Sequence, residues 1–496
     1  MWGPGRTDGA IACAGILVTG RPLRLHPDRL LPADPGTRGI ARRLLEHVRD
    51  LPIISPHGHC DPRWWALDEP FVDPSALLIT GDHYVVRLLH SVGVPLESLG
   101  RVPLDGGPVA TSREVWREFS SRYHLFHATP SRVWLDHALH EVLGVTVVPD
   151  AHNADELFDE LTERLQKPDL RPRALFDSFG IEFLATTESP LDDLSAHAAI
   201  HSSGWGGNVV TAFRPDPVVD PCHPSFLANL EVLAERSGVA VDTWPGYLEA
   251  LAERRRYFIA HGATSTDHGH PTAATADLDA SDAARLFDRV RRGDNTAAEA
   301  EAFRAQMLTE MVRMSLEDGL VVQLHPGSRR NHDGPSFARF GPDIGADIPT
   351  RTDYVTALGP LLERFGHEPA LTLVVFTLDE TTYSRELAPL AGYYPMLTLG
   401  APWWFHDSPE GMRRFRADTT GTAGLANTAG FTDDTRALLS IPARHDVARR
   451  VDCGYLAGLV AEHRLDEDVA AELAVELTYE RPRAVYRVDD SRFSTT

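Results

Sequence analysis

The chain has 496 residues, 43% of them hydrophobic, and its 48 basic and 71 acidic residues give a formal net charge of -23. This length can bury a large core, and one elaborated enzyme domain fits it. The acidic excess argues against a nucleic-acid or anionic-membrane partner, because both surfaces would repel the chain at ordinary salt. No apolar run approaches the roughly 18 residues of a membrane span. The four cysteines form no CxxC pair, which favours reduced thiols in a cytoplasmic protein.

The lysine content excludes several classes of enzyme. Lys167 is the only lysine, and it lies in the polar segment LTERLQKPDLRP, which is typical of an exposed helix end. Schiff-base aldolases, pyridoxal phosphate enzymes, Walker A nucleotide binding and two-metal sites with a carbamylated lysine each need that amine at a strand end or loop. Barrel enzymes with a single metal ion are not affected by this argument.

Short apolar runs rich in β-branched residues, leucine and phenylalanine recur along the chain, and helical periodicity follows them. This alternation is typical of repeated βα units around a parallel sheet. The eight predicted strands cover residues 51–57, 181–187, 208–215, 257–267, 320–327, 371–378, 395–403 and 424–434. Predicted helices between and after them cover residues 281–292, 297–318, 354–365, 385–391, 408–416 and 447–477. The sequence therefore predicts a distorted (β/α)8 barrel of the TIM type.

The connection between the first two predicted strands is unusually long. It exceeds about 100 residues and contains amphipathic stretches such as REVWREFSSRYHLF, which is too much for an ordinary βα loop. We expect a helical insertion over the barrel mouth, covering about residues 63–175. Residues 1–23 are expected to form a loose extension, and residues 24–496 to form the barrel itself.

Polar residues gather where the predicted strands end, which is where a parallel barrel carries its chemistry. The first strand ends in His57-Gly58-His59. Because side chains alternate along a strand, both imidazoles project to one side and can reach one metal ion. Such an HxH pair is weak evidence alone, since two solvated loop histidines look the same. Further candidates follow other strands: Asp267 and His268 after the fourth, His325 after the fifth, and Asp433 and Asp434 after the eighth.

Several short motifs then resemble, in order and spacing, those of the uronate isomerases, which belong to the amidohydrolase superfamily. They are HGHCDP at 57–62, GDHYVVR at 81–87, FRPD at 213–216, STDHG at 265–269, QLHPGSRRN at 323–331, WWFHD at 403–407 and DTRALLS at 434–440. The resemblance runs from about residue 24 to the end of the chain. It implies a distorted (β/α)8 barrel, a helical insertion after the first strand, and a zinc site.

The resemblance also implies roles for individual residues. Three resemble the metal ligands of the family: His57, His59 and Asp434. Six resemble residues that line its substrate pocket: Tyr84, Arg214, Asp267, His325, Trp403 and Arg436. Three protein ligands leave the open coordination position that a catalytic metal ion needs. Three departures from the family pattern, Ser55, the TTESP end of strand two and the TRA after Asp434, leave the preferred hexuronate undecided.

The chemistry implied is aldose-ketose isomerisation of D-glucuronate to D-fructuronate, of D-galacturonate to D-tagaturonate, or of both. Moving a proton between C2 and C1 needs a base, an electrophile for the oxygens and a group that binds the carboxylate. The proton-transfer candidates are Asp434, Tyr84, Asp267 and His325. Tyr84 could equally bind a sugar hydroxyl or pack in the insertion, and His325 could hydrogen-bond a hydroxyl.

Arginine suits the substrate carboxylate, because its planar guanidinium contacts both oxygens at once. Arg214, Arg330 and Arg436 qualify by their places near strand ends, and Trp403 could form an apolar wall for the sugar. The competing hypothesis is a mononuclear metal-dependent hydrolase, such as a lactonase or deaminase. Against it, LDETT at 378–382 stands where such enzymes carry a histidine. Assembly into a homo-oligomer is left open.

Overall fold

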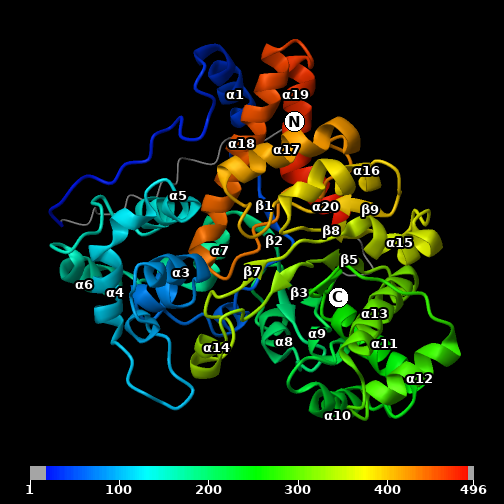
Figure 1. Cartoon of the computed structure of the whole chain (residues 1–496). Coiled ribbons are helices and arrows are strands. Elements are labelled where there is room, and N and C mark those ends of the chain that lie inside the picture. Colours follow the sequence, from blue (N-terminus) through cyan, green and yellow to red (C-terminus); the bar gives the residue numbers. More distant parts are fainter. Residues whose placement is uncertain (1–17, 490–496) are drawn as a thin grey trace. The chain divides into compact units, whose positions relative to one another are not determined.

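The computed structural model describes residues 18–489, and these divide into two compact units (Figure 1). The smaller unit comprises residues 18–29 and 70–170, and the larger comprises residues 30–69 and 171–489. Cys13 lies outside the described residues. Within residues 18–489, none of the helices combines the length and apolar character needed to cross a membrane.

A parallel sheet of seven strands forms the centre of the larger unit. In their order across the sheet, the strands are β1 (Ile53–Ser55), β2 (Ile181–Glu188), β3 (Val209–Phe213), β4 (Ser265–His268), β5 (Val321–Leu324), β8 (Leu373–Val375) and β9 (Leu397–Leu399). Every neighbouring pair is parallel. A small antiparallel pair, β6 (Ser328–Arg329) and β7 (Ile348–Pro349), lies after β5 in the sequence. The TIM-type α/β barrel predicted from the sequence is confirmed.

The eighth predicted strand is the most distorted part of this barrel. Residues 424–434 form no regular strand, and only a single bridge joins Thr428 to Leu399 of β9. On the other side the segment meets the end of β1: Asp434 N–H donates to His57 O at 3.2 Å, and His59 N–H donates to Thr435 O at 2.9 Å. Asp434 has φ 42°, outside the β region, so a continuous ladder cannot pass through it. The segment therefore closes the barrel as an irregular seam.

The fourth predicted strand began too early in the chain. Residues 257–260 belong to helix α11 (Trp244–Ala260), and β4 begins only at Ser265. Buried Tyr247, Leu251 and Phe258 of this helix share one apolar cluster, so the run Tyr-Phe-Ile-Ala completes a helical face. A short apolar run of this kind cannot be assigned to a strand or a buried helix by periodicity alone.

The larger unit also contains helices, most of which lie around the sheet (Figure 1). They are α1 (Pro35–Val48), α2 (Arg63–Leu67), α7 (Pro172–Ser178), α8 (Ser195–Ser202), α9 (Asp216–Val219), α10 (Phe226–Ser237), α11, α12 (Ala280–Val290), α13 (Ala297–Asp318), α14 (Gly334–Phe340), α15 (Tyr354–Phe365), α16 (Ala388–Ala391), α17 (Pro409–Ala423), α18 (Ile441–Ala461), α19 (Glu467–Val475) and α20 (Arg481–Val485), with short turns at 380–387, 438–440 and 476–480. The predicted helix at 447–477 is two helices, α18 and α19. Helix α13 has the bounds predicted from the sequence. A capping box of Thr296 and Glu299 begins the helix, and Gly319 at φ 84° ends it.

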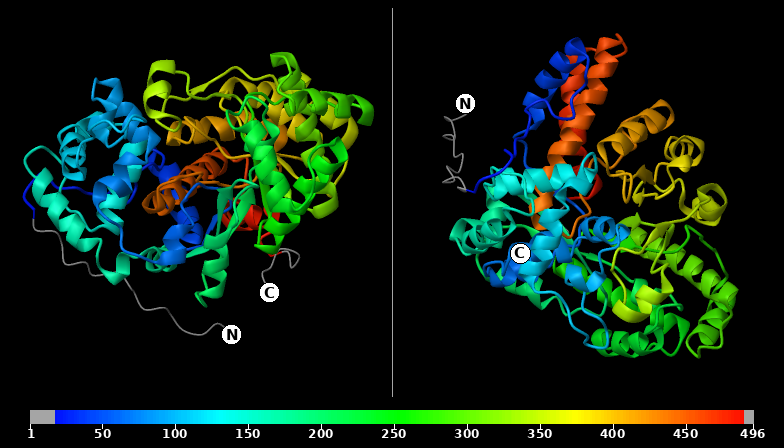
Figure 2. Two further views of the ribbon diagram at one scale, coloured as in Figure 1. Left: turned by 90° about the horizontal axis from the view of Figure 1, so that it is seen from below. Right: turned by 60° about the vertical axis from the view of Figure 1, so that its left-hand side comes forward.

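The beginning and the end of the larger unit pack together. Helix α1 lies beside α18 and α19 (Figures 1 and 2). Leu44 and Val48 of α1, Leu456 of α18 and Ala470 of α19 belong to one buried apolar cluster. This packing brings the chain segment before β1 and the segment after the seam into one layer of helices.

The smaller unit is helical. Its elements are α3 (His83–Ser91), α4 (Ser112–Ser121), α5 (Pro130–His137) and α6 (Ala154–Arg164), with short turns at 76–80, 96–99, 123–126, 138–142 and 168–170. Phe119, Tyr123 and Phe126 pack ring against ring inside it. The described part of the expected N-terminal extension pairs with this unit, because Leu23 N–H donates to Thr146 O at 2.8 Å.

Candidate active site

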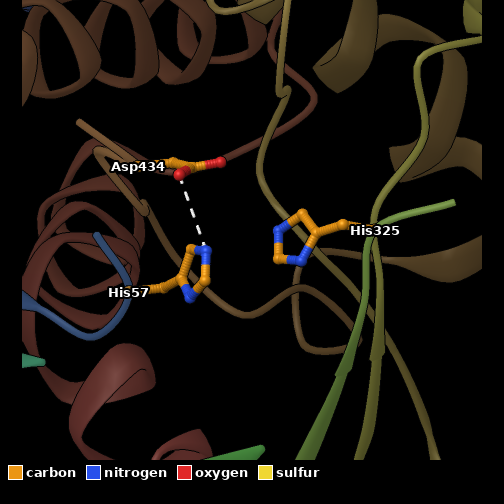
Figure 3. A group of neighbouring side chains, drawn as sticks. All are labelled: His57, His325 and Asp434. Atoms are coloured by element: carbon orange, nitrogen blue, oxygen red, sulfur yellow. Dashed lines mark ion pairs between the residues drawn. The ribbon is translucent and has the colours of Figure 1, made fainter. Parts of the chain in front are cut away.

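Four histidine and aspartate side chains meet at the carboxyl ends of strands in the larger unit. His57 follows β1, His325 follows β5, and Asp434 lies in the seam. Figure 3 shows these three side chains turned toward one another. One ligand atom from each lies within 4.8 Å of the other two. His59 joins them through Asp434, since its Nε2 lies 3.2 Å from Asp434 Oδ1, while His57 Nε2 lies 3.5 Å from the same oxygen.

The donor atoms of this cluster fit a divalent transition-metal ion. Among residues 18–489, His325 Nε2 is a buried ring nitrogen without a hydrogen-bond partner, and His57 turns its Nε2 toward Asp434. Neutral imidazoles together with one carboxylate are donors that zinc and similar ions prefer. The sequence indicated His57, His59 and Asp434 as ligands. The structure groups His325 with His57 and Asp434 within 4.8 Å, and it places His59 next to Asp434. Asp433 faces elsewhere and pairs with His445 at 3.0 Å.

The ionisation states of the cluster suit metal binding. Burial lowers the pKa of His57 to about 4, so its imidazole is neutral near pH 7. Burial alone would raise the pKa of Asp434, but His57 and His59 outweigh it and hold that pKa well below its ordinary value. Metal ligands must be deprotonated, and both side chains meet this condition.

Asp267 is the centre of a second set of contacts. Its Oδ1 lies 2.7 Å from His325 Nδ1, and its Oδ2 lies 3.0 Å from Arg214 Nη1. Burial would raise the pKa of Asp267, but Arg214, His57 and His325 hold that pKa well below its ordinary range. The carboxylate is therefore charged, and it fixes both the imidazole of His325 and the guanidinium of Arg214.

The charges of two arginines, Arg214 and Arg330, act on each other. Arg330 pairs with Asp347 at 3.3 Å. Burial lowers the pKa of Arg330 first, and the positive charge of Arg214 lowers it further, so the two guanidinium groups repel each other. Each guanidinium group is already paired with a protein carboxylate, and a substrate carboxylate between the two groups would further offset their repulsion.

Trp403 and Arg436 differ in how closely they approach the histidine and aspartate cluster. The buried ring of Trp403 meets the imidazole of His325 edge to face, with centroids 4.7 Å apart. Arg436 is 41% exposed and pairs with Asp343 at 3.1 Å. Trp403 is thus part of the cluster around His325, whereas Arg436 stands at the protein surface.

Tyr84 lies in the smaller unit, unlike the other predicted site residues. It is in the first turn of α3, where the Asp82 carboxylate caps the helix by accepting from Tyr84 N–H at 2.8 Å. Its ring packs edge to face against Trp134, with centroids 5.4 Å apart.

Two residues around the cluster were not predicted from the sequence. Phe376 stacks on His325 with centroids 3.9 Å apart, and it follows β8 in an ordinary apolar run that gives no signal. Asp216 accepts from Arg214 Nε at 2.9 Å. It stands two positions after Arg214 in the FRPD motif, so that motif contained a visible signal for the pair.

An α/β barrel with two histidines after its first strand and an aspartate in its last segment defines a protein of the amidohydrolase-like class with a candidate metal site. The glucuronate isomerase family matches residues 37–486. A uronate isomerase of Rhizorhabdus wittichii is 63% identical over 471 residues, which are 95% of this chain and 100% of that protein. The crystal structure of a glucuronate isomerase from Caulobacter crescentus superposes with a TM-score of 0.94 at 57% identity, covering 95% of this chain and 98% of that one.

A more distant uronate isomerase structure, from Thermotoga maritima, matches with a TM-score of 0.87 at 28% identity, over 93% of this chain and 99% of that one. The chain belongs to the uronate isomerase family, and it is an isomerase that acts on hexuronates. The competing hypothesis of a lactonase or deaminase is therefore set aside.

Proposed function

We propose that this isomerase interconverts D-glucuronate with D-fructuronate, D-galacturonate with D-tagaturonate, or both, at a site with one metal ion. One observation supports this most strongly: the Asp267 carboxylate joins Arg214, which suits a substrate carboxylate, to His325, which stacks on His57 with centroids 4.7 Å apart. The group that binds an acid and the groups that bind a metal ion are thus fixed in one network.

We propose zinc as the metal ion, held by His57, His59 and Asp434. Nitrogen and carboxylate donors suit zinc, and three protein ligands leave a position for substrate. When bound, the ion would act as a Lewis acid that polarises the sugar oxygens and offsets negative charge developing on them.

Arg214 and Arg330 are proposed to bind the substrate carboxylate. The guanidinium of Arg214 is held on two sides, by Asp216 at 2.9 Å and by Asp267 at 3.0 Å, so its remaining N–H groups point in a fixed direction. Arg436 is proposed as a further substrate-binding group, and Trp403 as the apolar wall for the sugar.

His325 is the proton-transfer candidate that the contacts favour most. Its Nδ1 lies 2.7 Å from the charged Asp267 carboxylate, which favours the tautomer with a proton on Nδ1 and leaves Nε2 as an acceptor. In this arrangement Asp267 orients the imidazole. Asp434 and Tyr84 remain proposed as partners in proton transfer, and a Tyr84→Phe variant that keeps full turnover would remove that residue from the list.

The test of this function is incubation of metal-quantified protein with D-glucuronate or D-galacturonate in deuterated water. NMR should show the corresponding keto-uronate, and deuterium in the product would indicate proton transfer through a group that exchanges with solvent. The rate ratio gives the substrate preference. His57→Ala is the control, because it should abolish turnover; turnover of neither acid by zinc-loaded protein would contradict the proposal.

Replacing Arg214 with methionine should weaken uronate binding while the metal ion is retained. Losing a charge-assisted contact to a carboxylate should raise KM by about 100-fold, or roughly 2.7 kcal/mol. Arg214→Lys should recover little, because an ammonium group cannot contact both oxygens. The matched control is Arg416→Met, which breaks a buried ion pair with Asp452 and should leave KM unchanged. An unchanged KM in Arg214→Met would exclude it from the substrate site.

Cytoplasmic location and assembly into a homo-oligomer remain proposals. Of the described cysteines, Cys60, Cys222 and Cys453 are all free thiols, which supports a reducing compartment. Light scattering of the purified chain would give its assembly state.

A further inference from the structure

A second His-Gly-His sequence, His268-Gly269-His270, stands at the end of β4. Together with Asp216 at the start of α9, its two histidines offer ligand atoms that all lie within 4.8 Å of one another. The proposed isomerase chemistry uses none of these three side chains as a ligand. Among residues 18–489 this is the second of two such groups.

This group faces away from the first one. Side chains alternate along a strand, so His268 and Asp267 point to opposite sides of β4. Asp267 contacts His325, whereas His268 Nε2 lies 3.0 Å from the Thr266 hydroxyl. Arg255 of α11 is among the charges that act on His268. The second group is therefore separate from the first, and Arg214 links the two because it pairs with both Asp216 and Asp267.

Two ring nitrogens of this group are buried without a partner. His268 is 0% exposed and His270 is 3% exposed. His268 Nδ1 and His270 Nε2 lack a hydrogen-bond partner within the described part of the chain, and His270 Nε2 lies 4.0 Å from Asp216 Oδ1. Leaving such a group unsatisfied costs about 1–3 kcal/mol, and coordination to a cation would satisfy both nitrogens at once.

The backbone holds Asp216 firmly in this place. Gly269 N–H donates to both carboxylate oxygens, at 3.0 and 3.2 Å. A Cβ at Gly269 would come within 2.3 Å of Arg214 Nη2 and 2.8 Å of Asp216 Oδ2, so only glycine permits this approach. Arg214 uses Oδ2, which leaves Oδ1 directed toward the histidines.

The surrounding charge also suits a cation. Both imidazoles are neutral near pH 7, because burial lowers the pKa of His268 to about 3 and lowers that of His270 as well. The acidic groups acting on the three side chains are Asp216, Asp267, Asp220 and Glu301, against the basic Arg214, Arg255 and Arg304. The carboxylates outnumber the guanidinium groups, although the three arginines lessen the attraction for a cation.

We propose that Asp216, His268 and His270 bind a second divalent transition-metal ion, of the zinc type. Two imidazoles and one carboxylate are a common donor set for such ions. This ion would hold Asp216, and through it the guanidinium of Arg214, without contacting the substrate. It would tie the segment after β3 to the end of β4.

Metal stoichiometry tests the proposal directly. Chelator-treated protein is reloaded with Zn²⁺, freed of excess ion by gel filtration, and analysed by mass spectrometry for metal per chain. We expect two ions in the wild type, one in His270→Ala and one in His57→Ala. The matched control is His197→Ala, because His197 is equally buried and has an unpartnered Nδ1, yet belongs to neither group. The His197→Ala variant should retain two metal ions per chain.

Loading with Co²⁺ separates the two sites by their visible absorption. His270→Ala should lose one part of the Co²⁺ spectrum and keep the part that His57→Ala loses. A wild type with one ion per chain, removed by His57→Ala and unaffected by His270→Ala, would overturn the second site and leave the proposed isomerase site intact. Two ions unaffected by His57→Ala would instead overturn the first site.

Discussion

The Asp434→Asn variant should bind no metal ion at the site and should have almost no turnover. We expect activity to fall by about three orders of magnitude or more, as it does when an enzyme loses a principal charge-stabilising group. Asp434 Oδ1 is the atom shared by His57 and His59, at 3.5 and 3.2 Å. An amide oxygen is neutral and a weaker ligand than a carboxylate. The variant also removes one candidate for proton transfer. Metal analysis and keto-uronate assays on the same samples measure the two effects together.

The neighbouring residue provides a matched control for this variant. Asp433 is buried even more deeply than its neighbour, and its Oδ2 pairs with His445 at 3.0 Å. In Asp433→Asn the amide oxygen can still accept from His445, so metal content and turnover should stay close to those of the wild type. Full metal content in Asp434→Asn would show that this carboxylate is not a ligand.

Asp267→Asn should impair both stability and catalysis. The substitution removes a buried negative charge that pairs with Arg214 and orients His325. Removing one partner of a buried ion pair lowers the free energy of unfolding by roughly 3–5 kcal/mol. Because Arg214 keeps its contact with Asp216, we expect a decrease near the lower end of this range. Turnover should fall as well, because the imidazole loses the charge that fixes its tautomer. Urea unfolding and the keto-uronate assay measure these losses.

The stability difference between wild type and Asp267→Asn should depend on pH. The pKa of Asp267 is depressed in the folded protein, so its carboxylate contributes stability above the unfolded pKa of about 3.9, and that contribution is lost as pH falls through the folded pKa. The difference should hold from neutral pH down to about pH 5 and shrink below about pH 4. A difference that grew on acidification would contradict this reasoning.

A variant outside the site separates the two effects of Asp267→Asn. Asp318 pairs with Arg255 at 2.6 Å on the outer helices. Asp318→Asn should lower the free energy of unfolding and leave KM and turnover unchanged. If Asp318→Asn and Asp267→Asn lost turnover equally, the loss in Asp267→Asn would come from lower stability alone.

The sequence predicted much of the barrel and the strand ends at which the candidate site residues lie, because strand ends and spacing are visible in a linear pattern. The HxH after β1 and the positions of His325 and Asp267 at strand ends follow from period-two alternation and from the edge where parallel strands meet. Helix α13 was predicted at 297–318, the bounds it has, since a threonine cap and a glycine mark its ends.

Other features depend on contacts that a linear pattern does not contain. Phe376, after β8, stacks on His325, after β5. Nothing in the linear sequence indicates that these two residues are in contact. The exposure of Arg436 could not be predicted, because it depends on which residues the folded chain brings next to this side chain. The start of β4 was misplaced because tertiary packing of α11 decided between helix and strand.

The irregular seam has a consequence for biosynthesis. His57 is among the first residues of the barrel to leave the ribosome, whereas Asp434 follows only after β9. The two meet through backbone bonds between the end of β1 and residues 434–435. A growing chain therefore exposes the imidazoles of its first strand throughout translation, and contacts of such long sequence separation form late. Barrel closure and completion of the His57–Asp434 cluster both require residues 434–435 to have been made.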